Sequence, residues 1–317
     1  MDASEDAFSE PVHLRRDLVG LGWNDRGIAD QLKRGIWVRP RRGAYLDAGT
    51  WKTLDAAGRH VIRTRAVVKQ ANTGVAVSHA SAVPWWGGPI WDLDLGHVHT
   101  TRLDGRLGRK EAGVHQHCGS LQEGDLAVVH GHQVTTPARV ALEVSTIASM
   151  EDSLVVLNDF LHRKLTTPQA VRERYERSID LWPNTRATEL VVRLGDPRIS
   201  SVLETRFCFF CFRARLPMPV PQYEVRTPDG HLVAVLDFAW PDLGAYVETN
   251  GRAKYLQLLK PDQEPGEVVE RERRRDELVQ GLTRMRGMHV SWTDLNAPRL
   301  LDKRVRDHLW PADEAAS

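Results

Sequence analysis

The turn at residues 228–230, with the sequence Pro-Asp-Gly, is the feature that most constrains how this chain can fold. It lies between two predicted strands, the sequence Tyr-Glu-Val-Arg at 223–226 and the largely apolar stretch at 231–240. Proline followed by aspartate and glycine favours a tight reversal, so the two stretches are predicted to pair as a hairpin. A second turn leads to a third predicted strand at 245–249.

Helices are predicted on both sides of these strands. Ser200 is expected to cap a helix that runs to about residue 215. The apolar side of this helix consists of Val202, Leu203, Phe207, Phe210 and Cys211. A highly charged helix at 267–286, a strand at 288–292 and a terminal helix at 298–309 follow. The last part of the chain therefore has the predicted order α-β-β-β-α-β.

Three carboxylates fall at informative positions in this order. Glu204 lies on the first helix, Asp237 inside the second strand and Glu248 inside the third. Acidic residues are poor strand formers, and Asp237 interrupts an apolar run where a buried charge is costly unless it is paired. Mg²⁺ is one suitable partner, because it is held by one or two carboxylates together with waters and substrate phosphate. Glu248 and Asn250 are two residues apart, so they face the same side of the strand.

The run Asp-Phe-Ala-Trp at 237–240, with Glu-Thr-Asn-Gly-Arg at 248–252, resembles the PD-(D/E)xK restriction-endonuclease-like fold. Within that fold it is most similar to the branch related to very-short-patch repair. Further matches are Pro221 and Gln222 before the first strand, the 271–276 run of the charged helix and Trp-Thr-Asp-Leu at 292–295. The resemblance covers about residues 199–310 and implies a nuclease-fold domain there.

The resemblance also implies roles for individual residues. Asp237 and Glu248 would hold Mg²⁺, Glu204 would orient a water or a second metal, and the residue at position 250 would activate the nucleophile. That residue is usually lysine, whereas this chain has Asn250, which carries no charge. Lys254, or the nearby Arg252, could take its place.

Three alternatives stay open for this domain. It could be a Mg²⁺-dependent DNA endonuclease or nickase, which makes the chain a possible metal-dependent endodeoxyribonuclease. It could instead be a nuclease-fold domain that has lost catalysis and serves only for binding. In the third alternative, Asp237 is a structural carboxylate paired with an arginine such as Arg273. Cys208 and Cys211 form a C-x-x-C, but they lie among phenylalanines and are interpreted as core residues rather than zinc ligands.

The N-terminal part of the chain is strongly basic. Residues 11–46 contain eight Lys and Arg against three Asp, a local net charge of +5. The pattern predicts a helix at 13–21 and a second helix that begins after Asn24 and ends near Arg34. Two short strands, at 36–39 and 44–46, are expected to follow around a turn. Together these elements predict a small winged helix-turn-helix domain at 11–48.

In such a domain the second helix and the hairpin would contact double-stranded DNA. The predicted DNA-binding residues are Arg26, Lys33, Arg34, Arg39, Arg41 and Arg42. The alternative is that these are solvated surface side chains on a helical hairpin that binds nothing.

Residues 50–185 are predicted to form a separate mixed α/β module. Two of its helices are expected to begin with Pro137 and Pro168, each after two threonines. The basic start ending in Arg-Gly-Ala-Tyr at 42–45, Ser-His-Ala-Ser-Ala at 78–82 and Val-Thr-Thr-Pro-Ala-Arg at 134–139 together resemble the AbiEi family. That family is associated with antitoxins of type IV toxin–antitoxin and phage-abortive systems, whose winged helix represses its own promoter.

The predicted class is therefore a multidomain α+β protein. We expect a DNA-binding regulator of the antitoxin or phage-defence type, with a cognate toxin or its operon as a possible partner. The alternative is the endonuclease described above. Lys plus Arg number 43 against 42 Asp plus Glu, so the whole-chain charge gives no indication of a nucleic-acid partner. The three cysteines and the absence of an apolar run of about 20 residues predict a cytoplasmic protein without a membrane partner.

Overall fold

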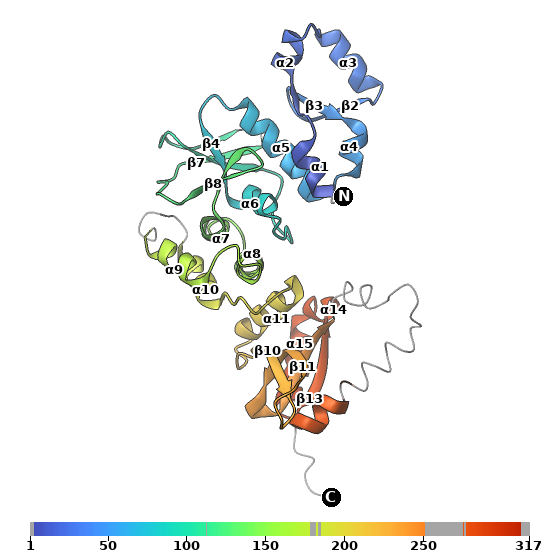
Figure 1. Cartoon of the computed structure of the whole chain (residues 1–317), viewed down its shortest axis with the longest axis vertical. Helices are drawn as coiled ribbons and strands as arrows, with labels where there is room; N and C mark the ends of the chain where they lie inside the picture. The colour runs from blue at the N-terminus through green and yellow to red at the C-terminus, as the bar shows by residue number, and fades with distance from the viewer. Residues whose placement is uncertain are drawn as a thin grey trace, which may run out of the picture. The chain divides into compact units, whose positions relative to one another are not determined.

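The computed structural model describes residues 3–111, 113–177, 182, 185–250, 275 and 277–311. The described residues form a mixed α+β structure with three sheets, and the chain divides into two compact units, Met1–Gly195 and Asp196–Ser317 (Figure 1). No helix among the described residues combines the length and the apolar character needed to cross a membrane.

The first unit begins with short helices and strands, drawn in blue in Figure 1. Their order is α1 (Ala3–Ser9), β1 (His13–Leu14), α2 (Arg15–Gly20), α3 (Asp25–Lys33), β2 (Trp37–Arg41) and β3 (Ala44–Asp47). The strands form a sheet in the order β1-β3-β2. Asn24 caps α3 as predicted, because its side chain accepts a hydrogen bond from the Gly27 N–H. Gly43 has φ +74°, which lets the chain reverse between β2 and β3.

The predicted helix at 13–21 is wrong at its start. His13 and Leu14 are in strand conformation and pair with Tyr45 and Ala44 of β3. Leu14 is buried in the apolar core, and this burial together with the ladder outweighs the helical pattern of the local sequence. The helix α1 was not predicted.

The rest of the first unit contains a six-stranded mixed sheet in the order β6-β7-β5-β4-β9-β8. Its strands are β4 (Val75–Val77), β5 (Val98–Arg102), β6 (Arg109–Glu111), β7 (Val114–His117), β8 (Leu126–Val129) and β9 (His132–Thr135). The helices before the sheet's second strand are α4 (Ala48–Thr53), α5 (Ala56–Gln70), α6 (His79–Ala82) and the 3-10 turn η1 (Val83–Trp86). After the last strand come α7 (Pro137–Ser145), α8 (Met150–His162), α9 (Pro168–Glu176) and α10 (Thr185–Leu194).

One apolar core joins the basic N-terminal elements to this sheet. Leu14 and Leu46 share a buried cluster with Ile62, Val77 and Phe160. The helix α4 also spans the boundary between the predicted domain at 11–48 and the predicted module at 50–185. A second, smaller cluster of Leu18, Ile28 and Tyr45 holds α2 and α3 on the hairpin.

The second unit has a four-stranded sheet in the order β10-β11-β12-β13. The strands are β10 (Val220–Arg226), β11 (Leu232–Trp240), β12 (Ala245–Asn250) and β13 (Arg286–Ser291). The helices are α11 (Val202–Arg213), the 3-10 turn η3 (Pro241–Leu243), α14 (Trp292–Leu295) and α15 (Pro298–Leu309). The predicted hairpin is confirmed, because β10 and β11 pair antiparallel around residues 228–230. β12 pairs antiparallel with β11 and parallel with β13.

Several boundaries in this unit differ from the predictions. The helix α11 is capped by Ser201 rather than Ser200, because the Ser201 hydroxyl accepts from the Glu204 N–H. Residues 275 and 277–283 are helical, but the chain turns at 284 and Arg286 already belongs to β13, so the charged helix is shorter than expected at its C-terminal end. The part of that helix at 267–274 lies outside the described residues. Cys208 and Cys211 are free thiols that pack in the apolar core, as predicted.

Candidate functional site

Five of the six predicted DNA-binding side chains are exposed. Arg26 and Lys33 belong to α3, Arg34 follows it, and Arg39 and Arg42 belong to the hairpin. Arg34 lies 3.5 Å from Asp30, an exposed i,i+4 pair of little energetic weight. These cations are therefore available to a polyanion.

Arg41 differs from the other five because it is partly buried. Its Nε donates to Gln70 Oε1 at 2.8 Å, and Gln70 Nε2 donates to the Arg42 carbonyl at 2.9 Å. Burial lowers the pKa of Arg41, and the negative charge of Glu111 offsets part of this decrease. The last residue of α5 thus fixes the tip of the β2–β3 hairpin to the body of the unit.

At Asp237 the alternating side chains of β11 switch from one face of the sheet to the other. Ala234 and Leu236 pack in one apolar cluster, whereas Phe238 and Trp240 pack in the other. On β10, Gln222 lies between Pro221 and Tyr223, which pair with Phe238 and Leu236, and it has φ +52°, a left-handed conformation that is uncommon for a non-glycine residue. The Asp237 carboxylate is buried and its Oδ2 accepts from the Thr249 N–H at 2.8 Å and from Thr249 Oγ1 at 2.7 Å.

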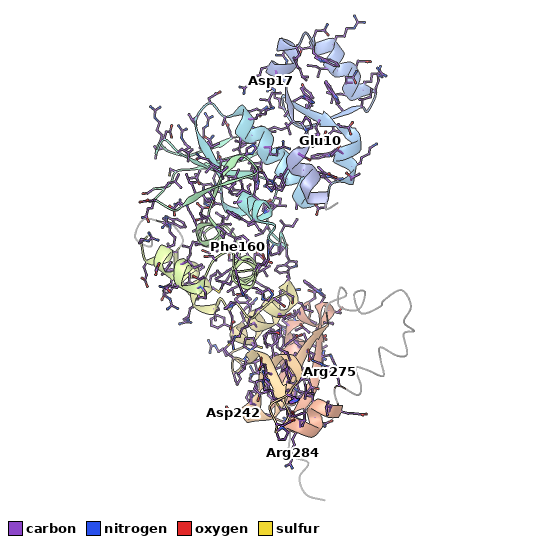
Figure 2. All side chains as sticks on the ribbon, in the orientation of Figure 1. Glu10, Asp17, Phe160, Asp242, Arg275 and Arg284 are labelled. Atoms are coloured by element: carbon purple, nitrogen blue, oxygen red, sulfur yellow. The ribbon has the colours of Figure 1, made fainter. Side chains whose placement is uncertain are left out.

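Glu248 is buried on the neighbouring strand and pairs with an arginine. Its Oε1 accepts from an NH2 group of Arg275 at 2.7 Å, and the same group donates to the Val235 carbonyl at 3.0 Å. Arg275 is labelled on the second unit in Figure 2. Glu248 is therefore paired with an arginine, Arg275.

Glu204 is held by the N-terminus of its own helix. It accepts from the Ser200 N–H at 3.0 Å and from the Ser201 hydroxyl at 2.8 Å. Gln222 Nε2 lies 3.4 Å from Glu204 Oε2, so this residue of β10 links α11 to the region opposite Asp237. Glu204 therefore takes part in the hydrogen bonds at the N-terminus of α11, in addition to any role in a site.

The structure thus brings Asp237 and Glu248 onto adjacent strands. Among the described residues, no group of three or more His, Cys, Asp and Glu side chains is arranged to hold a metal ion. Asn250 ends β12, and its side chain lies outside the described residues, as do Arg252, Lys254 and Arg273.

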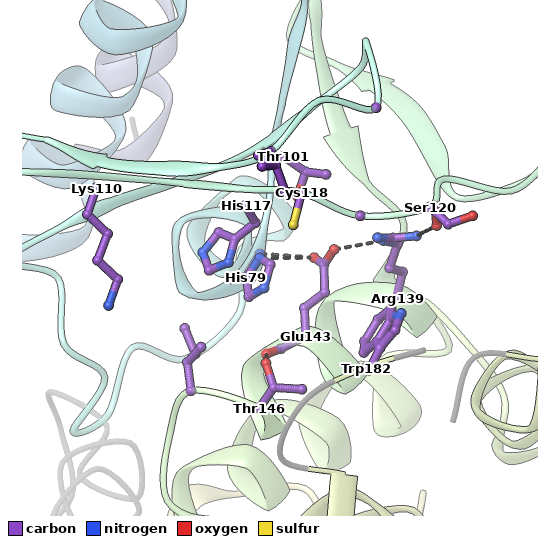
Figure 3. Close-up of a pocket in the computed structure, with 14 residues that line it drawn as sticks. His79, Thr101, Lys110, His117, Cys118, Ser120, Arg139, Glu143, Thr146 and Trp182 are labelled. Carbon is purple, nitrogen blue, oxygen red and sulfur yellow. Dashed lines mark hydrogen bonds and ion pairs between the residues drawn. The ribbon is translucent and has the colours of Figure 1, made fainter. Parts of the chain in front are cut away.

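A different cluster in the first unit was not predicted as a site. A cavity of about 810 Å³ is lined by side chains from α6, β5, β6, β7 and α7 (Figure 3). In the figure the labelled residues run from Lys110 through His117 and His79 to Glu143 and Arg139. Glu143 Oε2 accepts from the His79 N–H at 3.0 Å and from Thr135 Oγ1 at 2.9 Å.

The imidazoles beside this cavity are closely packed. The rings of His79 and His117 stack with centroids 3.6 Å apart, and His117 Nε2 lies 2.9 Å from His99 Nδ1. Burial lowers the pKa of His99 to about 2 and that of His117 to about 4. Burial, followed by the nearby His117 and Arg139, also holds the pKa of His79 well below its ordinary value. These rings are therefore neutral at pH 7.

Arg139 belongs to a buried ionic network. Its Nε donates to Glu143 Oε1 at 2.7 Å and its NH1 to Asp125 Oδ2 at 2.5 Å. Asp125 also receives two hydrogen bonds from Arg174, at 2.5 and 2.8 Å. Burial alone would raise the pKa of Asp125, but Arg174, the Gln122 N–H and Arg139 together lower it.

The sequence contained one signal for this cavity. His79 and Arg139 belong to the stretches 78–82 and 134–139 on which the resemblance to AbiEi rests, but neither was assigned a role. Glu143 lies 64 residues from His79, in a largely apolar helix, and it was not predicted to belong to a site.

No family model matches the chain, and no curated protein matches it. Among solved structures, the chain is similar to the RV2827C protein from Mycobacterium tuberculosis, with 16% sequence identity and a TM-score of 0.39. The match covers 72% of this chain and 87% of that one. At this TM-score the likeness carries no argument about function.

Proposed function

We propose that this chain is a DNA-binding regulator that contacts duplex DNA through α3 and the β2–β3 hairpin. The observation that carries the proposal is that these two neighbouring elements expose Arg26, Lys33, Arg34, Arg39 and Arg42. Two helices followed by a hairpin, α2-α3-β2-β3, support the proposal, because a winged helix-turn-helix would place its second helix in the major groove and its hairpin beside the backbone.

The proposed binding depends on phosphate contacts and is therefore sensitive to salt. Each phosphate contact that is lost should reduce the slope of log K against log salt by about 0.9. Arg39 and Arg42 are the suitable residues to change, because Arg41 also holds Gln70 and its loss would disturb the hairpin.

The experiment compares Arg39→Ala/Arg42→Ala with the parent chain by fluorescence anisotropy on duplex DNA from upstream of its own operon. The control is Arg172→Ala/Arg177→Ala, which removes two exposed arginines of α9 and its C-terminal end. The hairpin variant should bind more weakly and with a salt slope smaller by about 2, while the control should match the parent. Equal binding by both variants would refute the assignment of the hairpin.

The antitoxin or phage-defence role rests on the resemblance to AbiEi and is proposed on that basis. It implies a cytoplasmic protein that represses its own operon and counteracts a neighbouring toxin. Co-expression with the adjacent reading frame tests this, because the chain should restore the growth that the neighbouring product inhibits.

A second candidate is a Mg²⁺-dependent endonuclease or nickase of the PD-(D/E)xK type. It is favoured by two buried carboxylates, Asp237 and Glu248, on the adjacent strands β11 and β12 of a sheet with the expected α-β-β-β-α-β order. Their oxygens are of the kind that Mg²⁺ prefers, and the metal would activate water and neutralise charge on the phosphate. Arg275 occupies one oxygen of Glu248 and would compete with the metal.

Plasmid nicking with Mg²⁺ or Mn²⁺ tests this candidate. Asp237→Asn and Glu248→Gln should each abolish nicking, whereas Asp229→Asn, in the exposed turn, should leave it unchanged. Nicking that survives both substitutions belongs to another site or to a contaminant. No nicking by the parent chain on duplex, single-stranded or mismatched DNA would leave the second unit as a binding domain.

A further inference from the structure

A second cavity in the first unit shares part of its lining with the one beside His79 but differs from it in charge. Its volume is about 470 Å³, and its lining comes from α6, β5, β6, β7, α8 and the loops that hold residues 92–94 and 147–149. The charged side chains of the described residues that line it are three carboxylates, Asp92, Asp94 and Asp152, and one ammonium, that of Lys110 on exposed β6. Carboxylates therefore outnumber cations three to one.

The three imidazoles that line this cavity add no positive charge at pH 7. Burial lowers the pKa of His99 to about 2 and that of His117 to about 4. Burial, followed by the charges of His97 and Lys110, lowers the pKa of His115 as well. The lining therefore keeps an excess of negative charge and favours a cation over an anion.

Asp152 gives the cavity a carboxylate that is only partly paired. It is 6% exposed, and its Oδ2 accepts from Ser149 Oγ at 2.7 Å. The other oxygen, Oδ1, receives no hydrogen bond from any described residue and is not sealed from solvent. Burial raises the pKa of Asp152, and the negative charge of Asp92 raises it further, although the hydrogen bond from Ser149 opposes them. Because a buried charge is costly unless it is paired, this carboxylate gains from a cationic partner.

His99 supplies a hydrogen-bonding nitrogen to the same cavity. The residue is 5% exposed, and its Nδ1 lies 2.9 Å from His117 Nε2, so one of these two nitrogens donates to the other. His99 Nε2 forms no hydrogen bond with a described residue. When Nδ1 is the donor, Nε2 has a free lone pair and can accept from a ligand N–H. A ligand with several N–H donors therefore suits a cavity that holds both this nitrogen and the Asp152 carboxylate.

An organic cation fits this lining better than a metal ion. In the described part of the chain, no three or more His, Cys, Asp and Glu side chains are arranged to hold a metal. The cavity is instead within the range of about 300–1,000 Å³ that is typical of small-molecule sites. Leu93 and Ile147 give it an apolar surface.

We propose that this cavity binds a small organic cation, a primary ammonium or an amidinium attached to an apolar body. The charged nitrogens lie against Asp152 and Asp92, and one N–H is directed to His99 Nε2. The apolar body contacts Leu93 and Ile147. The proposal does not depend on DNA binding or on nuclease activity.

Isothermal titration calorimetry of the full chain at pH 7 tests the proposal with benzylamine, benzamidine and benzamide. Benzamidine and benzamide have nearly the same shape, but only benzamidine carries a charge. We expect one saturable site, with an affinity for at least one cation that is about tenfold or more above that for benzamide, because hydrogen bonds between charged groups are about twice as strong as those between neutral groups. The tighter of the two cations identifies the ligand as an ammonium or an amidinium. No saturable binding, or equal affinity for benzamide, would overturn the proposal.

Three variants locate the site. Asp92→Asn should weaken the cation about tenfold, and asparagine tolerates the φ of +52° at this exposed position. Asp152→Asn should also weaken it, and the asparagine carbonyl can still accept from Ser149. Lys110→Gln should instead tighten binding about threefold, because it removes a like charge from the lining. Asp229→Asn, which changes an exposed aspartate in the second unit, is the control and should bind as the parent does.

Asp92→Asn and Lys110→Gln change exposed side chains, so their effects report on the site rather than on folding. Full binding by both Asp92→Asn and Asp152→Asn would overturn the proposal. Weaker binding of the cation by Lys110→Gln would also overturn it, since the ammonium of Lys110 opposes a bound cation.

Discussion

Replacing Asp125 with asparagine should destabilise the first unit more than any comparable change at its surface. Asp125 is 1% exposed and accepts hydrogen bonds from Arg139, from Arg174 twice and from the Gln122 N–H. Asparagine fills the same space but removes the negative charge. Arg139 would keep Glu143 as a partner, whereas Arg174 would lose the carboxylate that neutralises it.

The magnitude follows from this loss. Removing one partner of a buried ion pair typically costs 3–5 kcal/mol, because an uncompensated charge stays in the interior. One nitrogen of Arg174, NH1, is already buried without a hydrogen bond to the described residues. Loss of the carboxylate would therefore leave more of this guanidinium buried without a negatively charged partner. For a unit of this size, the melting temperature should fall by roughly 10 °C.

Differential scanning calorimetry of the full chain measures the effect, with the transition of the second unit as an internal reference. Asp104→Asn is the matched control, because Asp104 pairs with Arg102 in a more exposed loop, where an ion pair contributes little to stability. Adding Arg174→Met to Asp125→Asn should restore part of the stability by removing the uncompensated charge. An Asp125→Asn variant that is no less stable than Asp104→Asn would refute the reasoning.

Three further predictions concern the first unit. Gln70→Leu removes both hydrogen bonds that hold the hairpin tip and should weaken duplex binding about threefold to tenfold in anisotropy titrations, whereas Gln169→Leu, on exposed α9, should not. Burial lowers the pKa of His60 to about 4, so between pH 6.5 and pH 4 the unfolded chain takes up a proton that the folded chain does not. Urea titrations should therefore show stability falling by roughly 3 kcal/mol over that range on account of this residue, and less in His60→Gln. Gly43→Ala should lower the melting temperature, because φ there is +74°, while Gly27→Ala in α3 should raise it by removing glycine from a helix; the opposite order would contradict both assignments.

Local signals in the sequence determined many of the elements. Asn24 caps α3 and Pro298 begins α15, because capping and the fixed φ of proline act within one turn of chain. The turn at 228–230 specifies the β10–β11 hairpin for the same reason. The buried position of Asp237 also followed from the apolar run around it.

Tertiary structure decided what depends on distant parts of the chain. His13 and Leu14 have a helical pattern, and only pairing with β3, about 30 residues away, makes them a strand. The arginine partner of Glu248 and the meeting of His79 with Glu143 likewise join residues that are 27 and 64 positions apart. No local propensity specifies such pairs, because their free energy arises only when the fold removes both groups from water.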